Sequence, residues 1–172
     1  MKYPDFSDRN TRTGTLGIVA VGALILAAPF IAQAATSDGE PEVTEVSAGG
    51  VTLRDADGNA LQCAQTSANG AEDGPGTWRW DCDGTKIQLR ADYTMTDEAE
   101  RANAVTRMYW QVSNGERIDT DELERPAPGV YAVHRNDISV AAVERGDLTV
   151  YATAPDDAGR EIVERLVAEE AK

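Results

Sequence analysis

The chain has 172 residues, with 16 lysines and arginines against 30 aspartates and glutamates, so its net charge at pH 7 is −14. Such a charge repels phosphate backbones and anionic lipid headgroups, because nucleic-acid binding depends on clustered cations that release counterions. The composition therefore argues against nucleic acid as a partner. It favours cations, basic proteins or neutral ligands, or an acidic surface that only confers solubility.

A long apolar segment, residues 15–35, follows a short polar tail or n-region, residues 1–14. No charged side chain lies between Arg12 and Asp38, and this length is close to the roughly 20 apolar residues of a bilayer-spanning helix. Because Arg9 and Arg12 precede the segment, the positive-inside rule predicts a single-pass membrane anchor with an extracytoplasmic C-terminal domain.

The same segment also fits a cleavable signal peptide. Residues 16–26 would form its hydrophobic region, and Pro29 would break the helix. An A-x-A site then follows, with cleavage between Ala34 and Ala35. Both interpretations export the rest of the chain, and the bias toward Ala, Asp, Glu and Arg is typical of a high-GC bacterium. We therefore expect a bacterial envelope protein, attached to the cell membrane or secreted.

The chain has two cysteines, Cys63 and Cys82, and both follow the apolar segment. An even number of cysteines in an oxidising compartment predicts a disulfide, which would stabilise the fold by about 3 kcal/mol in the chain-entropy model. A zinc site is a poor alternative, since His134 is the only histidine and structural zinc normally takes four ligands. We expect a Cys63–Cys82 disulfide and no metal or cofactor.

By composition, the remaining chain divides into a linker, residues 36–50, and one folded domain, residues 51–172. Within the linker, residues 43–46 are a candidate edge strand. Residues 51–54 and 61–65 alternate apolar and polar side chains around a turn sequence, which predicts a β-hairpin.

The next stretch, residues 66–77, contains Asn-Gly and Gly-Pro-Gly sequences and predicts a loop. The clearest hairpin in the chain follows, with residues 77–82 and 86–93 alternating on either side of a turn at Asp83-Gly84. The alternation predicts one apolar face that packs against the disulfide. This face consists of Trp78, Trp80, Cys82, Ile87, Leu89, Ala91 and Tyr93.

Asp97 fits an N-cap, with Glu100 three residues later and apolar residues at helical spacing beyond it, which predicts a helix over 97–113. Tyr109 and Trp110 are neighbours in this helix. Neighbouring helical positions point about 100° apart, so one of the two side chains leaves the core. An exposed tryptophan marks an interface, and the candidate interface is Trp110 with Tyr109.

Three short apolar runs follow, residues 130–134, 138–143 and 148–154, separated by tight-turn sequences. These runs predict an antiparallel meander. Pro155 at a first helical position, followed by apolar residues at helical spacing, predicts a C-terminal amphipathic helix.

Both parts of the domain are therefore strands followed by a helix, a pattern that suggests a pseudo-repeat. We predict the α+β class: an antiparallel sheet of hairpins and a meander with two helices on one face, preceded by the N-terminal transmembrane or signal helix.

Few residues point to catalysis. His134 lies in a predicted strand, and the chain lacks the G-x-S-x-G and H-E-x-x-H motifs, so catalysis through histidine is a poor hypothesis. Acidic pairs such as Asp55 and Asp57 fit turn and capping roles, and the glycine that follows them is misplaced for a calcium loop. The sequence identifies no catalytic residue.

We expect a non-catalytic, membrane-anchored or secreted envelope domain that binds another protein or an envelope component. One alternative is an accessory subunit of a membrane protein complex, in which small residues of the apolar segment contribute to the interface. Another is a small exported hydrolase that uses two carboxylates, and a cleft holding acids with separated pKa values would favour it. The sequence leaves enzymatic activity undecided.

Overall fold

The computed structural model describes residues 41–71 and 74–172. The apolar segment at 15–35 and the cleavage site at Ala34 and Ala35 lie outside these described residues. Within them, no helix is both long enough and apolar enough to cross a bilayer.

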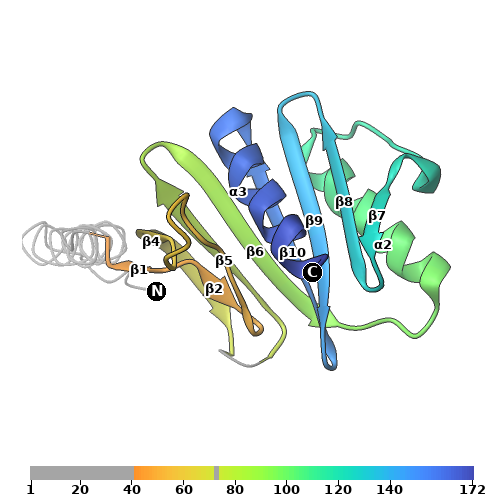
Figure 1. Cartoon of the computed structure of the whole chain (residues 1–172), viewed down its shortest axis with the longest axis horizontal. Helices are drawn as coiled ribbons and strands as arrows, with labels where there is room; N and C mark the ends of the chain where they lie inside the picture. The colour runs from red at the N-terminus through yellow and green to blue at the C-terminus, as the bar shows by residue number, and fades with distance from the viewer. Residues whose placement is uncertain (1–40, 72–73) are drawn as a thin grey trace, which may run out of the picture. The chain divides into compact units, whose positions relative to one another are not determined.

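In the described part of the chain, eight strands form an antiparallel sheet that packs with two α-helices (Figure 1). The strands of this sheet are β1 (Val43–Glu45), β4 (Gln62–Gly70), β5 (Gly76–Cys82), β6 (Thr85–Tyr93), β7 (Glu124–Ala127), β8 (Val130–Arg135), β9 (Ile138–Arg145) and β10 (Leu148–Pro155). The other elements are the paired strands β2 (Ser47–Ala48) and β3 (Val51–Thr52), the helices α2 (Glu98–Val112) and α3 (Asp156–Glu170), and the short 3-10 helix η1 (Thr120–Glu122). The α+β class is therefore confirmed.

The strands follow the order β1-β4-β5-β6-β10-β9-β8-β7 across the sheet. β4, β5 and β6 form one meander, β8, β9 and β10 form another, and the two meanders join where β6 pairs with β10. Each meander is followed by a helix. We call β4, β5 and β6 the open half of the sheet and β8, β9 and β10 the covered half.

The helices α2 and α3 pack on opposite faces of the covered half (Figure 1). In β9, Ala141 and Val143 belong to the core under α3, whereas Val140 and Ala142 belong to the core under α2. The prediction that both helices lie on one face is therefore wrong. Strands covered on both faces are apolar at nearly every position, because both sets of alternate side chains are buried.

Contacts at both ends hold α2 over the covered half. The Asp97 carboxylate caps its first turn, as predicted. Nε of Arg101 lies 2.8 Å from Oε1 of Glu144 on β9. At the other end, the hydroxyl of the buried Tyr109 donates a hydrogen bond of 3.2 Å to the Glu116 carboxylate. The Tyr109 hydroxyl also lies 3.3 Å from the backbone carbonyl of Arg135 on β8, so each end of α2 is tied to a strand of the covered half.

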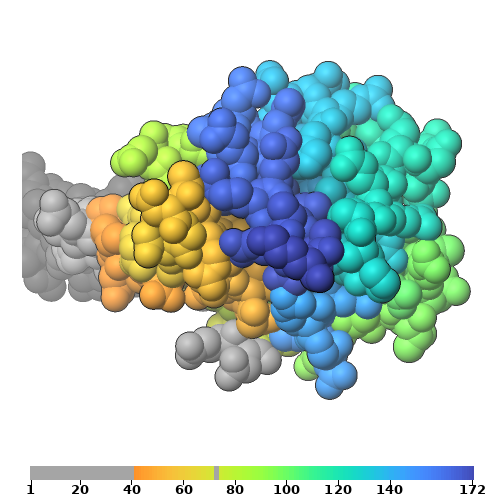
Figure 2. All heavy atoms as spheres, in the orientation of Figure 1, coloured from red at the N-terminus to blue at the C-terminus, as the bar shows by residue number. Residues whose placement is uncertain are grey.

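The opposite face of the sheet is closed by α3 and by the β2–β3 hairpin (Figure 2). α3 approaches β10 so closely that a Cβ atom added at Gly159 would stand 2.4 Å from the Cβ of Ala154. Val46, directly before β2, and Val51, the first residue of β3, belong to the same core cluster as Trp80 of β5. Both halves of the sheet thus share one continuous core on this face.

The folded unit begins before residue 51. It extends from Pro41 to Lys172, and Val46 is fully buried. β1 supplies the edge strand anticipated at 43–46, since it pairs with β4. The interpretation of 36–50 as a linker is therefore wrong from Pro41 onward, because apolar side chains in this polar stretch enter the core.

Most of the predicted loop at 66–77 is in fact strand. β4 continues to Gly70, and β5 begins opposite it at Gly76. A Cβ atom added at Gly76 would stand 2.6 Å from the ring of Trp78. The glycines therefore leave room for the indole within paired strands, whereas their sequence alone is typical of a loop.

The other hairpin predictions have mixed outcomes. The Cys63–Cys82 disulfide is confirmed, with Cα atoms 4.9 Å apart, and it joins β4 to β5. The hairpin of β5 with β6 is also confirmed, but Tyr93 at its end is 71% exposed and not in the core. The hairpin expected at 51–65 is reduced to a bridge between Arg54 and Ala60, because β3 pairs with β2.

Candidate functional site

The α2 side of the open half is a polar surface. β5 and β6 bury their apolar side chains on the α3 side and direct the alternate positions to this surface. Those positions are Thr77, Arg79, Asp81, Lys86, Gln88, Arg90 and Asp92. On this face, α2 covers only the covered half of the sheet. At the junction of the two halves, the face therefore changes from strands open to solvent to strands beneath a helix.

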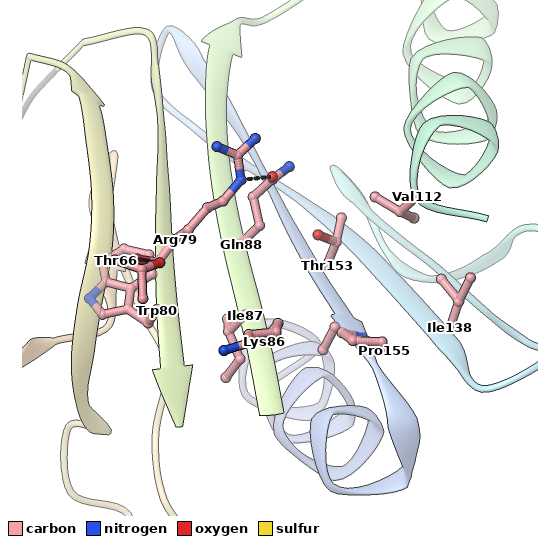
Figure 3. Close-up of a pocket in the computed structure, with 11 residues that line it drawn as sticks. Thr66, Arg79, Trp80, Lys86, Ile87, Gln88, Val112, Ile138, Thr153 and Pro155 are labelled. Carbon is pink, nitrogen blue, oxygen red and sulfur yellow. Dashed lines mark hydrogen bonds between the residues drawn. The ribbon is translucent and has the colours of Figure 1, made fainter. Parts of the chain in front are cut away.

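The surface is hollowed at this junction, in a cleft of about 310 Å³ that we call the open-face cleft (Figure 3). Arg79 on β5 and Gln88 on β6 line one side of it. The other side is apolar and consists of Val112 at the end of α2, Ile138 at the start of β9 and Pro155 at the end of β10. The cleft therefore combines an apolar wall with a charged one.

The two cations of the cleft have different partners. Lys86 forms an ion pair with Asp81, and this hydrogen bond, with another from the backbone N–H of Gly84, lowers the pKa of the Asp81 carboxyl. Arg79 instead donates from Nε to Oε1 of Gln88 over 2.8 Å. Among the described residues, no carboxylate lies within ion-pair distance of Arg79. Within residues 41–71 and 74–172, its guanidinium is thus the cation of the cleft that has no counter-charge.

A second hollow, the Trp110 groove, lies along α2 and has a volume of about 410 Å³. It is lined by Thr106, Arg107, Trp110, Gln111, Arg117, Ile118 and Asp119. Trp110 is 47% exposed, whereas Tyr109 is fully buried. The prediction that one member of this pair leaves the core is confirmed, and Trp110 is that residue. The role of the pair as an interface stays a prediction.

Two arginines, Arg107 and Arg117, line the groove with Trp110. In the part of the chain that the structure describes, neither has a carboxylate within ion-pair distance. Arg135, by contrast, pairs with two glutamates. The acid in the lining, Asp119, is the N-cap residue of η1. The groove thus presents an indole and two cations on a chain whose net charge is −14.

The features that would support catalysis are few. Within residues 41–71 and 74–172, no group of three His, Cys, Asp or Glu side chains is placed to hold a metal ion. His134 lies 3.0 Å from the hydroxyl of Ser139, which is fully buried and so out of reach of a substrate. The pKa values of Asp55, Asp81 and Glu116 are lowered, chiefly by hydrogen bonds, whereas a general acid at neutral pH needs a raised pKa.

No protein-family model, no curated protein and no solved structure matches this chain. The two hollows are thus the basis for inferring function. Sequence reasoning identified Trp110 but missed the open-face cleft. Outward positions such as Arg79 were visible in the alternation of the hairpin, but the opposite wall comes from distant parts of the chain, including Val112 and Ile138.

Proposed function

We propose that the folded domain is a non-catalytic, extracytoplasmic binding domain of the bacterial envelope, and that it binds a protein partner through the Trp110 groove. The observation that carries this proposal is the exposed indole of Trp110, which is 47% exposed and lies with Arg107 and Arg117 in one hollow. Tryptophan and arginine, together with tyrosine, are enriched among the residues that dominate binding energy in protein interfaces.

The surroundings of Trp110 distinguish it from other exposed apolar side chains. Val43 and Tyr93 are more exposed, at 64% and 71%, but Val43 lies in the edge strand β1 and Tyr93 ends β6. Trp110 lies in a hollow that could accept a side chain of the partner, and its two arginines favour a partner segment that carries carboxylates. The groove therefore favours an acidic segment of another protein.

The cellular location is also part of the proposal. The Cys63–Cys82 disulfide gives weak support to an extracytoplasmic domain, because disulfides persist in oxidising compartments. We propose that residues 15–35 either anchor the domain in the cell membrane or are removed during export. In the anchored form, the protein would act as an accessory subunit whose domain reaches a neighbouring membrane protein.

Site-specific photocrosslinking in the native host tests the proposed function. A benzophenone amino acid replaces Trp110 in the full chain, and the matched control replaces the exposed Glu161 on α3. We expect a discrete crosslinked product from position 110 only, because the groove is the contact surface. Mass spectrometry of that product identifies the partner and shows whether it is an integral membrane protein.

The charge of the groove provides the second control. Replacement of Arg107 and Arg117 by glutamate should abolish the product from position 110, since the two cations would become like charges facing an acidic segment. An unchanged urea midpoint would show that this variant still folds. Equal products from positions 110 and 161, or a product that survives the charge reversal, would contradict the proposal.

A further inference from the structure

The open-face cleft shares no lining residue with the Trp110 groove. It lies where the bare strands β5 and β6 meet the end of α2 and the ends of β9 and β10 (Figure 3). Its volume, about 310 Å³, is at the small end of the range for ligand pockets. The cleft therefore suits a small molecule better than a segment of a protein.

The apolar wall offers a surface for a hydrocarbon group. Val112 and Ile138 are half-buried, and Pro155 is exposed, so each still presents apolar surface to the cleft. Thr153, which is 5% exposed, lies between the two walls, as Figure 3 shows. Covering this apolar surface with a hydrocarbon group removes it from water, and this favours binding.

The opposite wall carries Arg79, whose guanidinium has no carboxylate partner among the described residues. Because Nε of Arg79 is held by Oε1 of Gln88 at 2.8 Å, the plane of the guanidinium is fixed while its terminal amino groups keep their hydrogens. The hydroxyl of Thr66 donates to the backbone carbonyl of Arg79 over 3.1 Å, which ties this strand position to β4. A guanidinium in this arrangement is suited to a carboxylate, which it can bind through two parallel hydrogen bonds.

The charges around the cleft favour a ligand with a single negative charge. The Lys86 ammonium is already paired with Asp81, so Arg79 is the one cation of the lining with no acidic partner in the described residues. A phosphate or a dicarboxylate would bring a second negative charge close to Asp81. An uncharged ligand would leave the Arg79 guanidinium without a counter-charge beside the apolar wall.

We propose that the open-face cleft binds a small amphipathic monocarboxylate, such as a medium-chain fatty acid. The carboxylate pairs with the guanidinium of Arg79, and the hydrocarbon chain lies along Val112, Ile138 and Pro155. This site is independent of the Trp110 groove, and its test does not depend on the protein partner.

Isothermal titration calorimetry of the disulfide-bonded protein with octanoate, below its micelle concentration, tests the proposal, with octanol as the neutral analogue. We expect saturable binding of octanoate and binding of octanol at least 10-fold weaker, because octanol carries no charge to pair with the Arg79 guanidinium. Replacement of Arg79 by glutamine should weaken octanoate binding at least 10-fold and leave octanol unchanged. Arg145→Gln, at an exposed site away from the cleft, is the matched control.

A second variant tests the apolar wall. Val112→Thr keeps the shape of the side chain but replaces a methyl group with a hydroxyl, so it should weaken octanoate and octanol by similar factors of about 2–5. Octanol binding as tightly as octanoate, an unchanged affinity in Arg79→Gln, or no saturable binding would each overturn the proposal. Urea midpoints of both variants close to that of the unmodified protein would show that the loss comes from the cleft and not from unfolding.

Discussion

The two halves of the sheet are built on different principles. The covered half, β8 to β10, is buried on both faces, by α2 on one side and α3 on the other. The open half, β4 to β6, has a core on the α3 side only, and polar residues face solvent on the other side. The Trp110 groove lies along α2, the helix on the covered half. The open-face cleft lies at the junction between the end of α2 and the bare strands of the open half.

The difference shows that two meanders of one sheet can have different roles. The covered half provides a rigid centre, since side chains on both faces are fixed by packing. The open half presents charged and polar groups such as Arg79 and Gln88 on one face, while its apolar side chains pack in the core on the other. Function is therefore expected on the open half and on the exposed side of α2, and stability is expected to come mainly from the covered half.

The largest expected effect on stability comes from introducing a carboxylate on the α2 side of the sheet, which we compare between the covered half and the open half. Val140 of β9 is fully buried under α2, whereas Thr77 of β5 lies on the open side and pairs in register with Arg90. Val140→Glu should lower the free energy of unfolding by at least about 4 kcal/mol, because it buries an unpaired carboxylate, and Thr77→Glu should change it by less than about 0.5 kcal/mol. Urea unfolding curves of the two variants measure both changes in the free energy of unfolding. Similar decreases in the two variants would contradict the inference that this face is buried in the covered half and open to solvent in the open half.

The disulfide should give the next largest effect. Replacement of Cys63 and Cys82 by alanine removes a link across 19 positions of sequence and should lower the free energy of unfolding by about 3 kcal/mol. Because the link joins β4 to β5, hydrogen exchange should accelerate more in the open half than in β8 to β10. Exchange measured by mass spectrometry checks this. Uniform acceleration would show that the two halves are not separately stabilised.

The smallest expected effect concerns Glu116, which helps to hold α2 on the covered half. Its carboxylate accepts hydrogen bonds from the Asn136 amide and the Tyr109 hydroxyl and pairs with Arg135, and these contacts lower its pKa. A carboxyl with a lowered pKa stabilises the fold above the ordinary glutamate pKa of about 4.3, and the stabilisation is lost as the pH falls through the folded-state pKa. Stability should therefore decline below about pH 4.3.

Urea midpoints at pH 5 and pH 3 measure the contribution of this carboxylate. Glu116→Gln should show a smaller decrease between the two pH values than the unmodified protein, because glutamine does not titrate. Glu161→Gln, at an exposed position of α3, is the control and should retain the full decrease. An equal decrease in Glu116→Gln would show that this carboxylate does not link stability to pH.

Local patterns predicted the elements that depend on neighbouring residues. The N-cap at Asp97 and the turn at Asp83-Gly84 are short-range hydrogen-bonding features, and both were predicted correctly. The placement of the helices was not, although the covered strands carried the signal: β9 reads Ile-Ser-Val-Ala-Ala-Val, with little polar alternation. A run buried on both faces requires a layer on each side, and this inference was available from the sequence.

Other features depend on contacts between distant segments. Gly70 and Gly76 have the sequence character of a loop, and only the indole packed on them explains why they are strand residues. β7 was missed, since Pro126 and its polar neighbours resemble a turn and β8 is the one strand that this edge strand pairs with in the described sheet. The open-face cleft likewise joins Arg79 to Val112 across separate elements, and no local pattern connects them.

The pairing of β6 with β10 has a consequence for how the domain is assembled. These strands are neighbours near the middle of the sheet, but α2 and strands β7 to β9 lie between them in the chain. A chain that emerges amino end first therefore carries the edge of β6, and apolar side chains such as Leu89, unprotected until β10 and α3 are made. Since β10 and α3 follow the other described elements in the chain, we expect the centre of the sheet to be completed only after both have been synthesised.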